Sequence, residues 1–120
     1  MQKMKVKKPW GAYEVLLDEP NYKVKRIVVH PYERFSLQYH KHREEHWVIV
    51  KGDGIVQVKQ KEYPAIARSH WVILPRELHR ATAGSTGLIF IETQIGNCYE
   101  EDIIRLEDDY GRLDSDVVSV

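Results

Sequence analysis

The sequence predicts an all-β fold, a single domain whose strands close into a barrel or pack as two sheets. Short runs that alternate apolar and polar side chains recur along the chain, and most of them stop near a proline or a glycine. Such runs at a spacing of roughly 8 to 12 residues are typical of sandwiches and barrels, in which few strand edges stay unpaired. Helical periodicity is scarce, and we expect at most one helical turn, within residues 99–106.

The strand boundaries follow from turn residues. Residues 46–50 lead into Gly52-Asp53-Gly54, which we predict to be a tight turn, and residues 55–60 are then the hairpin partner. The other strands are expected at residues 22–29, 71–74 and 88–94, each ending close to a proline or a glycine, and at residues 35–40, which lead into a run of histidines and glutamates.

The composition is that of one soluble globular domain. The 120 residues are 42% hydrophobic and 30% charged, a size and balance that favour a single core. Because 18 basic side chains balance 18 acidic ones, nothing favours nucleic acid or an anionic membrane as a partner. No apolar run is long enough to span a membrane. The one cysteine, Cys98, cannot form an internal disulfide, so we expect a cytoplasmic protein.

Histidines and glutamates cluster in residues 40–46, ahead of an apolar run. Imidazole nitrogens and carboxylate oxygens are ligands for Zn²⁺ and other first-row divalent metals. In an extended chain His40 and His42 lie on the same side, and Glu45 joins them if a bend or bulge resets the alternation. The alternative is a solvated charged turn. A further histidine, His79, follows a later strand and favours a metal site.

These residues resemble the two motifs of the cupin superfamily. In the first motif a His-x-His pair precedes a glutamate that lies seven positions before a glycine, as Glu45 precedes Gly52. The second ends in a ligand histidine after a proline, although Pro75 and His79 are closer together than is usual. The resemblance implies a double-stranded β-helix, or jelly-roll barrel. It also implies a divalent metal, Zn first with Mn, Co, Ni or Fe as alternatives, held by His40, His42, Glu45 and His79.

A closer resemblance extends over residues 9–112. It is carried, in this order, by PWGAYEVL (9–16), YKVKRI (22–27), SLQ (36–38), HREEHW (42–47), ETQIG (92–96), EDIIR (101–105) and DYGR (109–112). Together these segments resemble the type II mannose-6-phosphate isomerase domain, which usually follows a mannose-1-phosphate guanylyltransferase domain. No nucleotide-binding loop precedes Pro9. We therefore expect a free-standing cupin domain over residues 1–120, with its core at about 9–112, and no guanylyl transfer.

The resemblance implies an isomerase that interconverts mannose 6-phosphate and fructose 6-phosphate. The reaction moves a proton between C1 and C2 through a cis-enediolate, whose charge a divalent metal would stabilise. Arg43 lies inside the metal motif and is expected to contact the substrate, with a surface pair to Glu44 or Glu45 as the alternative. The candidate bases are Glu92, His46 and Glu44. Inside the barrel the pKa of Glu92 would be raised, and His46 is alternatively a residue that orients Glu45.

Three further residues are candidates for substrate binding. Gln38 lies two positions before His40 and so on the same face of a strand. Arg105 is a candidate for binding the phosphate, with a structural ion pair as the alternative. Trp47 is first an apolar anchor, and it is the tryptophan to test for contact with the sugar.

Two other functions stay open. One is an isomerase or epimerase that acts on another sugar phosphate or on a nucleotide sugar. The other is a non-catalytic module that contains a metal and binds a sugar, which the shortened second motif would favour. The fold does not decide between them. The resemblance also implies a homodimer, because cupin domains often pair through edge strands.

Overall fold

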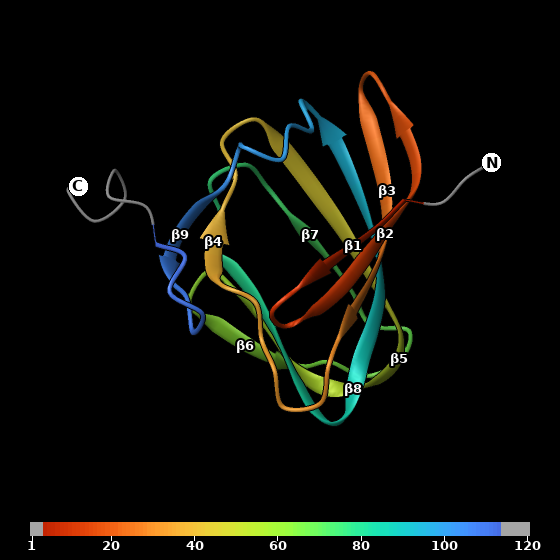
Figure 1. Cartoon of the computed structure of the whole chain (residues 1–120), viewed down its shortest axis with the longest axis vertical. Coiled ribbons are helices and arrows are strands. Elements are labelled where there is room, and N and C mark those ends of the chain that lie inside the picture. The colour runs from red at the N-terminus through yellow and green to blue at the C-terminus, as the bar shows by residue number, and fades with distance from the viewer. Residues whose placement is uncertain (1–3, 114–120) are drawn as a thin grey trace.

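The computed structural model describes residues 4–113, which form an all-β domain without a helix among them (Figure 1). The strands are β1 (Met4–Lys8), β2 (Gly11–Glu19), β3 (Tyr22–Val29), β4 (Leu37–Tyr39), β5 (Arg43–Val58), β6 (Lys61–Pro64), β7 (His70–Ile73), β8 (His79–Gly96) and β9 (Ile104–Glu107). In the part of the chain described here, no helix is long and apolar enough to cross a membrane.

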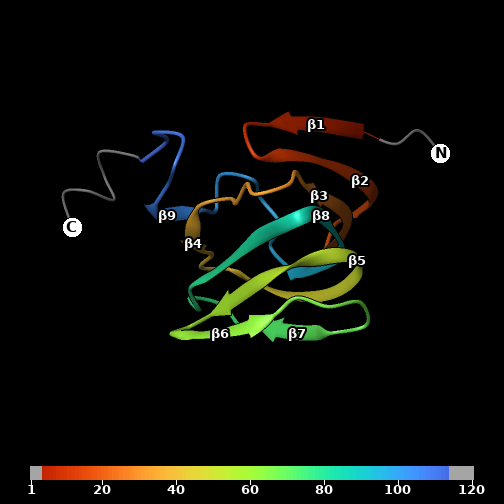
Figure 2. The ribbon, with the colours of Figure 1, turned by 90° about the horizontal axis from the view of Figure 1, so that it is seen from below.

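The strands belong to one antiparallel sheet that curls around the interior. The order is β1-β2-β3-β8-β4-β9, with β5 joined to β8 and with β6 and β7 joined to β5. In Figure 2, β6 and β7 lie on one side of the molecule, and β1 lies on the opposite side. The curled sheet therefore surrounds the interior of the domain, in which the buried core residues lie.

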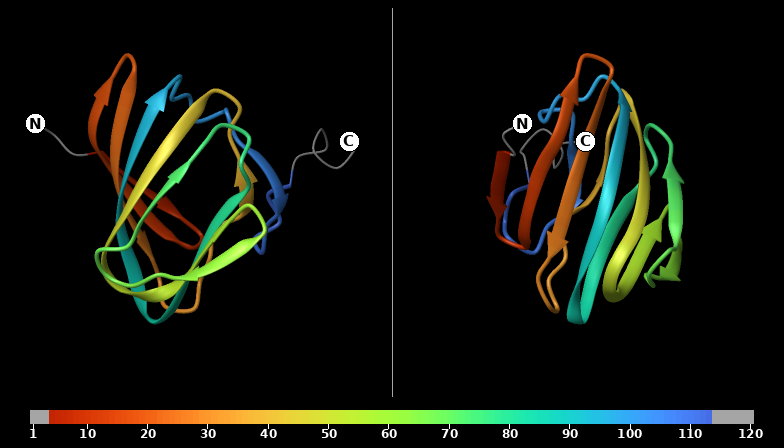
Figure 3. Two further views of the ribbon diagram at one scale, coloured as in Figure 1. Left: turned by 180° about the vertical axis from the view of Figure 1, so that it is seen from behind. Right: turned by 90° about the vertical axis from the view of Figure 1, so that its right-hand side faces the viewer.

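β5 and β8 form a long ribbon that runs through both halves of the barrel (Figure 3). They pair from Arg43 with Gly96 to Val58 with His79, and the register shifts between Ile49 and Gly54. On one side of the shifts β3 pairs with β8 and β7 with β5, and on the other side β4 pairs with β8 and β6 with β5. Two halves that share one such ribbon are typical of jelly rolls.

The tight turn predicted at Gly52-Asp53-Gly54 is wrong, because these residues lie inside β5. Gly52 has a φ of +102°, and a Cβ built on it would lie 2.1 Å from the carbonyl oxygen of Gly87 in β8. Glycine is therefore required by the close approach of two strands where the ribbon bends, and not by a hairpin. Residues 55–58 continue along β8 instead of folding back on residues 46–50.

The helical turn expected within residues 99–106 is also wrong. The Asp102 amide donates to the Tyr99 carbonyl at 3.1 Å in an isolated turn, and Ile104–Glu107 then forms β9 against β4. The other predicted strands occur. Residues 22–29 form β3 in full. The strand predicted at residues 35–40 contains the shorter β4, the one at 71–74 corresponds to β7, and the one at 88–94 lies within the longer β8.

The inward-facing residues change from polar to apolar along each central strand, so the barrel has a polar end and an apolar end. The apolar end packs around Trp47, whose ring centroid lies 4.6 Å from that of Phe90 and 5.8 Å from that of Phe35. Burial of such rings is a large stabilising contribution. The polar end is formed by buried residues of the same three strands, namely Lys23 and Lys25 in β3, Arg43 and Glu45 in β5, and Glu92 and Gln94 in β8.

Candidate metal centre and active-site pocket

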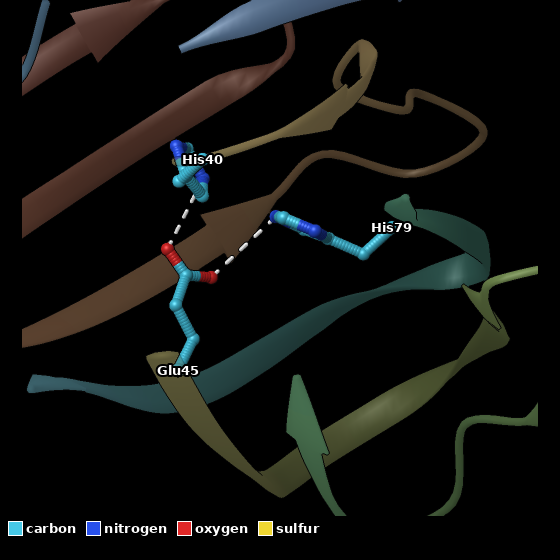
Figure 4. A group of neighbouring side chains, drawn as sticks. All are labelled: His40, Glu45 and His79. Atoms are coloured by element: carbon cyan, nitrogen blue, oxygen red, sulfur yellow. Dashed lines mark ion pairs between the residues drawn. The ribbon is translucent and has the colours of Figure 1, made fainter. Parts of the chain in front are cut away.

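His40, Glu45 and His79 bring their side chains together at the polar end of the barrel (Figure 4). One potential ligand atom from each lies within 4.8 Å of the others. Glu45 Oε2 is 3.2 Å from His40 Nε2, and Glu45 Oε1 is 3.6 Å from His79 Nε2. All three residues are buried, with exposures of 4%, 1% and 1%. The fold thus gathers three of the predicted ligands from distant parts of the sequence.

Backbone carbonyls orient both imidazoles. His40 Nδ1 lies 2.5 Å from the Asp102 carbonyl oxygen, and His79 Nδ1 lies 2.9 Å from the Glu77 carbonyl oxygen. Because a carbonyl only accepts, each Nδ1 carries a hydrogen, and in the neutral ring each Nε2 has a lone pair. Both Nε2 atoms lie beside the Glu45 carboxylate, and His40 Nε2 is also 3.1 Å from Arg43 Nη2, which can donate to it. Such orientation of a ligand histidine through its other nitrogen is typical of metal sites.

The charge of the cluster also suits a cation. Burial lowers the pKa of His79 to about 4, so this ring is neutral at pH 7. Burial has the opposite effect on Glu45, but His40, His79 and Arg43 outweigh it and hold the pKa of the Glu45 carboxyl well below its usual range. An ionised carboxylate therefore meets two imidazole nitrogens in a buried space. This donor set fits a divalent transition metal.

The structure does not bring His42 into the cluster, contrary to the prediction. The chain bends at Lys41 and His42, and both backbone amides donate to the Asp102 carboxylate at 2.9 Å. The extended geometry that would place His40 and His42 on one side is therefore absent, and the His42 side chain is exposed. The same bend resets the alternation, so that Glu45 faces the interior.

Arg43 and Trp47 hold the carboxylate of Glu45. Arg43 Nε and Nη2 lie 3.0 and 2.9 Å from Glu45 Oε2, and Trp47 Nε1 donates to Oε1 at 3.0 Å. Arg43 Nη1 donates to the Tyr99 carbonyl at 3.2 Å, so every nitrogen of the guanidinium already has a protein partner. Trp47 is only 1% exposed, and its ring packs against Phe35, Phe90 and His79. Both residues position Glu45, in place of the substrate contacts predicted for them.

The cluster lies in a cavity of about 150 Å³. Apolar core residues form part of its wall, and charged or polar side chains converge on it from several strands. A concave site with a few convergent polar groups is the usual form of a small-molecule site. Besides the cluster and Arg43, the polar lining includes Gln38, Lys25, Glu92, Glu100, Lys8, Arg105 and Arg112.

Glu92 has the most unusual protonation behaviour in this pocket. It is 5% exposed and lies on β8, where it faces the interior of the barrel. Burial, and next the charge of Glu45, raise the pKa of Glu92 to about 7, against the attraction of Lys25 and Arg43. Gln94 Nε2 donates to Glu92 Oε1 at 2.6 Å. A carboxyl group with a pKa near neutrality is suited to take up and release a proton.

The sequence profile described as Mannose-6-phosphate isomerase C-terminal matches residues 1–108. The chain belongs to this family. It is 39% identical over 107 residues to a mannose-1-phosphate guanylyltransferase of Klebsiella pneumoniae, covering 88% of this chain and 23% of the relative. It is 40% identical over 109 residues to the alginate biosynthesis protein AlgA of Pseudomonas aeruginosa, covering 89% and 23%. The chain thus spans about a quarter of the length of the curated relatives it matches.

Solved structures of low sequence identity share the fold. The nucleoside dehydratase Pac13 has a TM-score of 0.72 at 17% identity, over 88% of this chain and 86% of that chain. A cupin-2 domain from Rhodospirillum rubrum has a TM-score of 0.68 at 17% identity, over 84% and 77%. At these identities the likeness establishes a cupin-type fold and not a shared chemistry.

His46 faces away from the pocket of this family member, which corrects its prediction as a base or as an orienting residue. Glu45 faces the interior, so the next residue of β5 faces outward. His46 Nε2 lies 2.7 Å from a carboxylate oxygen of Glu44, and these side chains are 39% and 37% exposed. The pair lies on the outer surface, so neither residue reaches a substrate in the pocket.

Gln38 and Arg105 both line the pocket, and they lie on neighbouring strands. Gln38 is in register with His79 on one side and with Arg105 on the other. It is buried, and its Nε2 donates to Ser36 Oγ at 3.0 Å. Their positions are compatible with the substrate contacts predicted for them.

The pocket also contains a charged group that the sequence reasoning missed. Lys25 is 4% exposed, and its Nζ lies 2.7 Å from Glu100 Oε1 and 4.0 Å from the centroid of the Tyr13 ring. A signal was present, because Lys23 and Lys25 lie on the same strand face as Ile27. A lysine on the apolar face of a strand is rarely buried unless it is paired.

Proposed function

We propose that this chain is a metal-dependent mannose-6-phosphate isomerase, which interconverts mannose 6-phosphate and fructose 6-phosphate. Membership of the family supports an isomerase-type domain. The observation that carries the proposal is the buried Glu92, with its pKa raised to about 7, in the same pocket as the His40, Glu45 and His79 cluster. Isomerisation of an aldose to a ketose needs a base of this kind within reach of C2.

His40, Glu45 and His79 would hold the divalent metal, for which we propose Zn²⁺ first and Mn, Co, Ni or Fe as alternatives. When bound, the metal would supply the Lewis acidity that stabilises negative charge on the sugar oxygens. Arg43 and Trp47 each give a hydrogen bond to a different oxygen of Glu45, which restricts the carboxylate to one orientation. This second layer of contacts supports a ligand geometry that exists before the substrate arrives.

Glu92 moves the proton in this proposal. Its carboxylate takes the proton from C2 of open-chain mannose 6-phosphate, which leaves the cis-enediolate. The same proton returns to C1 while the hydroxyl proton passes from O2 to O1, so the reaction is balanced without a further donor. The apolar residues Ile27, Phe35 and Trp47 form part of the pocket wall and keep water away from the enediolate.

The test is a coupled assay of the purified chain, reconstituted with each divalent metal in turn, that follows fructose 6-phosphate formed from mannose 6-phosphate. We expect turnover that a chelator abolishes, that rises with pH through about 7, and that falls by about a hundredfold or more in Glu92→Gln. Lys61→Gln, at an exposed position of β6, is the control and keeps full turnover.

Absence of turnover with every metal, despite stoichiometric metal binding, would refute the isomerase. The same preparation should then be assayed with other sugar phosphates and with nucleotide sugars, because the alternative isomerase or epimerase would use the same pocket. Metal binding without turnover of any of them would favour the non-catalytic module.

We further propose that the protein is a cytoplasmic homodimer. The single, partly buried Cys98 supports a reducing compartment. Val48, Val50 and Val72 are 46%, 52% and 49% exposed on the outer face of β5 and β7, and an apolar surface of this kind supports pairing of two copies. Light scattering coupled to gel filtration measures the mass, and a monomer at micromolar concentration would contradict the dimer.

A further inference from the structure

The proposed isomerisation needs two proton transfers, and Glu92 carries out only one of them. Glu92 moves a proton between C2 and C1, whereas a second proton must leave O2 and arrive at O1. The group that carries this second proton must line the same pocket and must both give and accept a proton. Arg43 does not meet this condition, because a guanidinium keeps its proton in proteins.

Lys25 lines this pocket and lies directly beside Glu92. The two residues are in register where β3 pairs with β8 in the antiparallel sheet. Side chains of such a pair leave the sheet on the same face, with their Cβ atoms about 4.5 to 5.5 Å apart. Lys25 is 4% exposed and Glu92 is 5% exposed. An ammonium group and the proposed base therefore enter one cavity from adjacent positions.

Glu100 and Tyr13 hold the Lys25 ammonium in place. Lys25 Nζ lies 2.7 Å from Glu100 Oε1 and 4.0 Å from the centroid of the Tyr13 ring. An ammonium has three hydrogens, and Glu100 is its one hydrogen-bond acceptor among residues 4–113. Even with a second hydrogen directed at the face of the Tyr13 ring, the third is available to a sugar oxygen.

The carboxylate of Glu100 is shared between two lysines. Lys23 Nζ lies 3.3 Å from the same oxygen, Oε1, and also donates to the Cys98 carbonyl at 3.2 Å. One carboxylate thus faces two ammonium groups, so this cluster keeps a net positive charge beside Glu92. Lys23 does not line the pocket, whereas Lys25 does. The charge that the pocket receives from this cluster is therefore that of Lys25.

We propose that Lys25 is a further catalytic residue, which carries the hydroxyl proton from O2 to O1 while Glu92 carries the proton between the carbons. The inference rests on the proposed function. After Glu92 has taken the proton from C2, an N–H bond of Lys25 breaks and its proton forms the O1–H bond. The neutral amine then takes the proton from O2. Glu92 returns its proton to C1 as the carbonyl forms at C2, and both residues regain their starting states.

Steady-state kinetics of the full chain with mannose 6-phosphate test this role. We expect kcat of Lys25→Met to fall by about a hundredfold or more, while KM stays within about threefold of the wild type. Lys25→Arg keeps a cation for Glu100 but cannot cycle a proton, so it should remain folded and show the same loss of kcat. Lys23→Met is the matched control, because it removes the other ammonium from Glu100, and it should retain kcat.

Chemical rescue separates proton transfer from a structural role. Lys25→Ala leaves space for a small amine, and methylammonium chloride should raise its kcat by at least about tenfold. Tetramethylammonium chloride carries the same charge without a transferable proton and should give no increase. Equal rescue by both salts would overturn the proton transfer.

The outcomes distinguish this role from the proposed function. If the wild type is active and Lys25→Met or Lys25→Arg keeps kcat within about threefold, Lys25 is not catalytic and the isomerase stands. If the wild type converts no sugar phosphate with any metal, both proposals are wrong. If it converts a different aldose phosphate, the proposed substrate is wrong, and the same variants decide the role of Lys25, because every such isomerisation moves a proton from O2 to O1.

Discussion

Replacing Glu92 with glutamine should make the protein more stable and less active. The folded protein raises the pKa of Glu92 from its ordinary value of 4.5 to about 7. Between these two values the folded chain binds more protons at this position than the unfolded chain does. The wild type therefore loses stability as pH rises from 4.5 to 7. Below pH 4.5 the Glu92 carboxyl is protonated in both the folded and the unfolded chain, so it does not lower the stability of the fold. Glutamine carries no charge, so the Glu92→Gln variant should lack this dependence of stability on pH.

The loss of folding stability can be calculated from the difference between the two pKa values of Glu92. From 4.5 to about 7 the loss amounts to about 3 kcal/mol, because one pH unit is worth about 1.4 kcal/mol. Glutamine has nearly the same shape, and its side-chain oxygen can still accept the hydrogen bond from Gln94 Nε2, which measures 2.6 Å. We therefore expect the free energy of unfolding of Glu92→Gln to exceed that of the wild type by about 3 kcal/mol at pH 8. At pH 5 the difference should shrink to less than about 1 kcal/mol.

Urea unfolding in the presence of a chelator, followed by tryptophan fluorescence at pH 5 and pH 8, measures both differences. Glu62→Gln, at an exposed position of β6, is the control for loss of one negative charge and should leave both values within about 0.5 kcal/mol of the wild type. Equal stability of Glu92→Gln and the wild type at pH 8 would refute the burial of an ionisable carboxyl at this position. A lower stability at pH 8 would refute it as well.

Other substitutions test the metal centre and the fold. His40→Ala and His79→Ala should each lose stoichiometric Zn²⁺ in elemental analysis while keeping the β-sheet circular dichroism, whereas His42→Ala should retain the metal; loss of metal in His42→Ala alone would contradict the cluster. Trp47→Phe removes the donor to Glu45 Oε1 at 3.0 Å and should lower the free energy of unfolding by about 1 to 3 kcal/mol, so an unchanged urea midpoint would argue against this hydrogen bond. Gly52→Ala places a Cβ 2.1 Å from a carbonyl oxygen of β8 and should cost more than about 3 kcal/mol in thermal unfolding.

Local pattern was sufficient for the β-architecture and for several interior positions. Alternation is a property of neighbouring residues, so residues 22–29 were predicted in full as a strand, and the pattern around Glu92 offered an interior position as one of two alternatives. Glu45 was chosen as a ligand through its spacing to Gly52, and it lies between His40 and His79 in the structure. A period of two residues carries this information wherever a strand remains regular.

The positions that the sequence misjudged depend on contacts between distant segments. The Asp102 carboxylate binds the amide of Lys41 from 61 positions away, and this contact bends the chain, turns His42 outward and sets which residues of β5 face the interior as far as Ile49. Gly52 looks like a hairpin residue until β8 is seen to approach it.

The sequence by itself determined an all-β cupin-type domain and the kinds of side chain that meet inside it. Only the tertiary structure decided that His46 lies outside the pocket, that Arg43 binds Glu45, and that Lys8 joins Arg105 in the lining of the pocket. The physical reason is that β1 and β9 lie near opposite ends of the described chain, and curling of the sheet, not local sequence, brings them to one cavity.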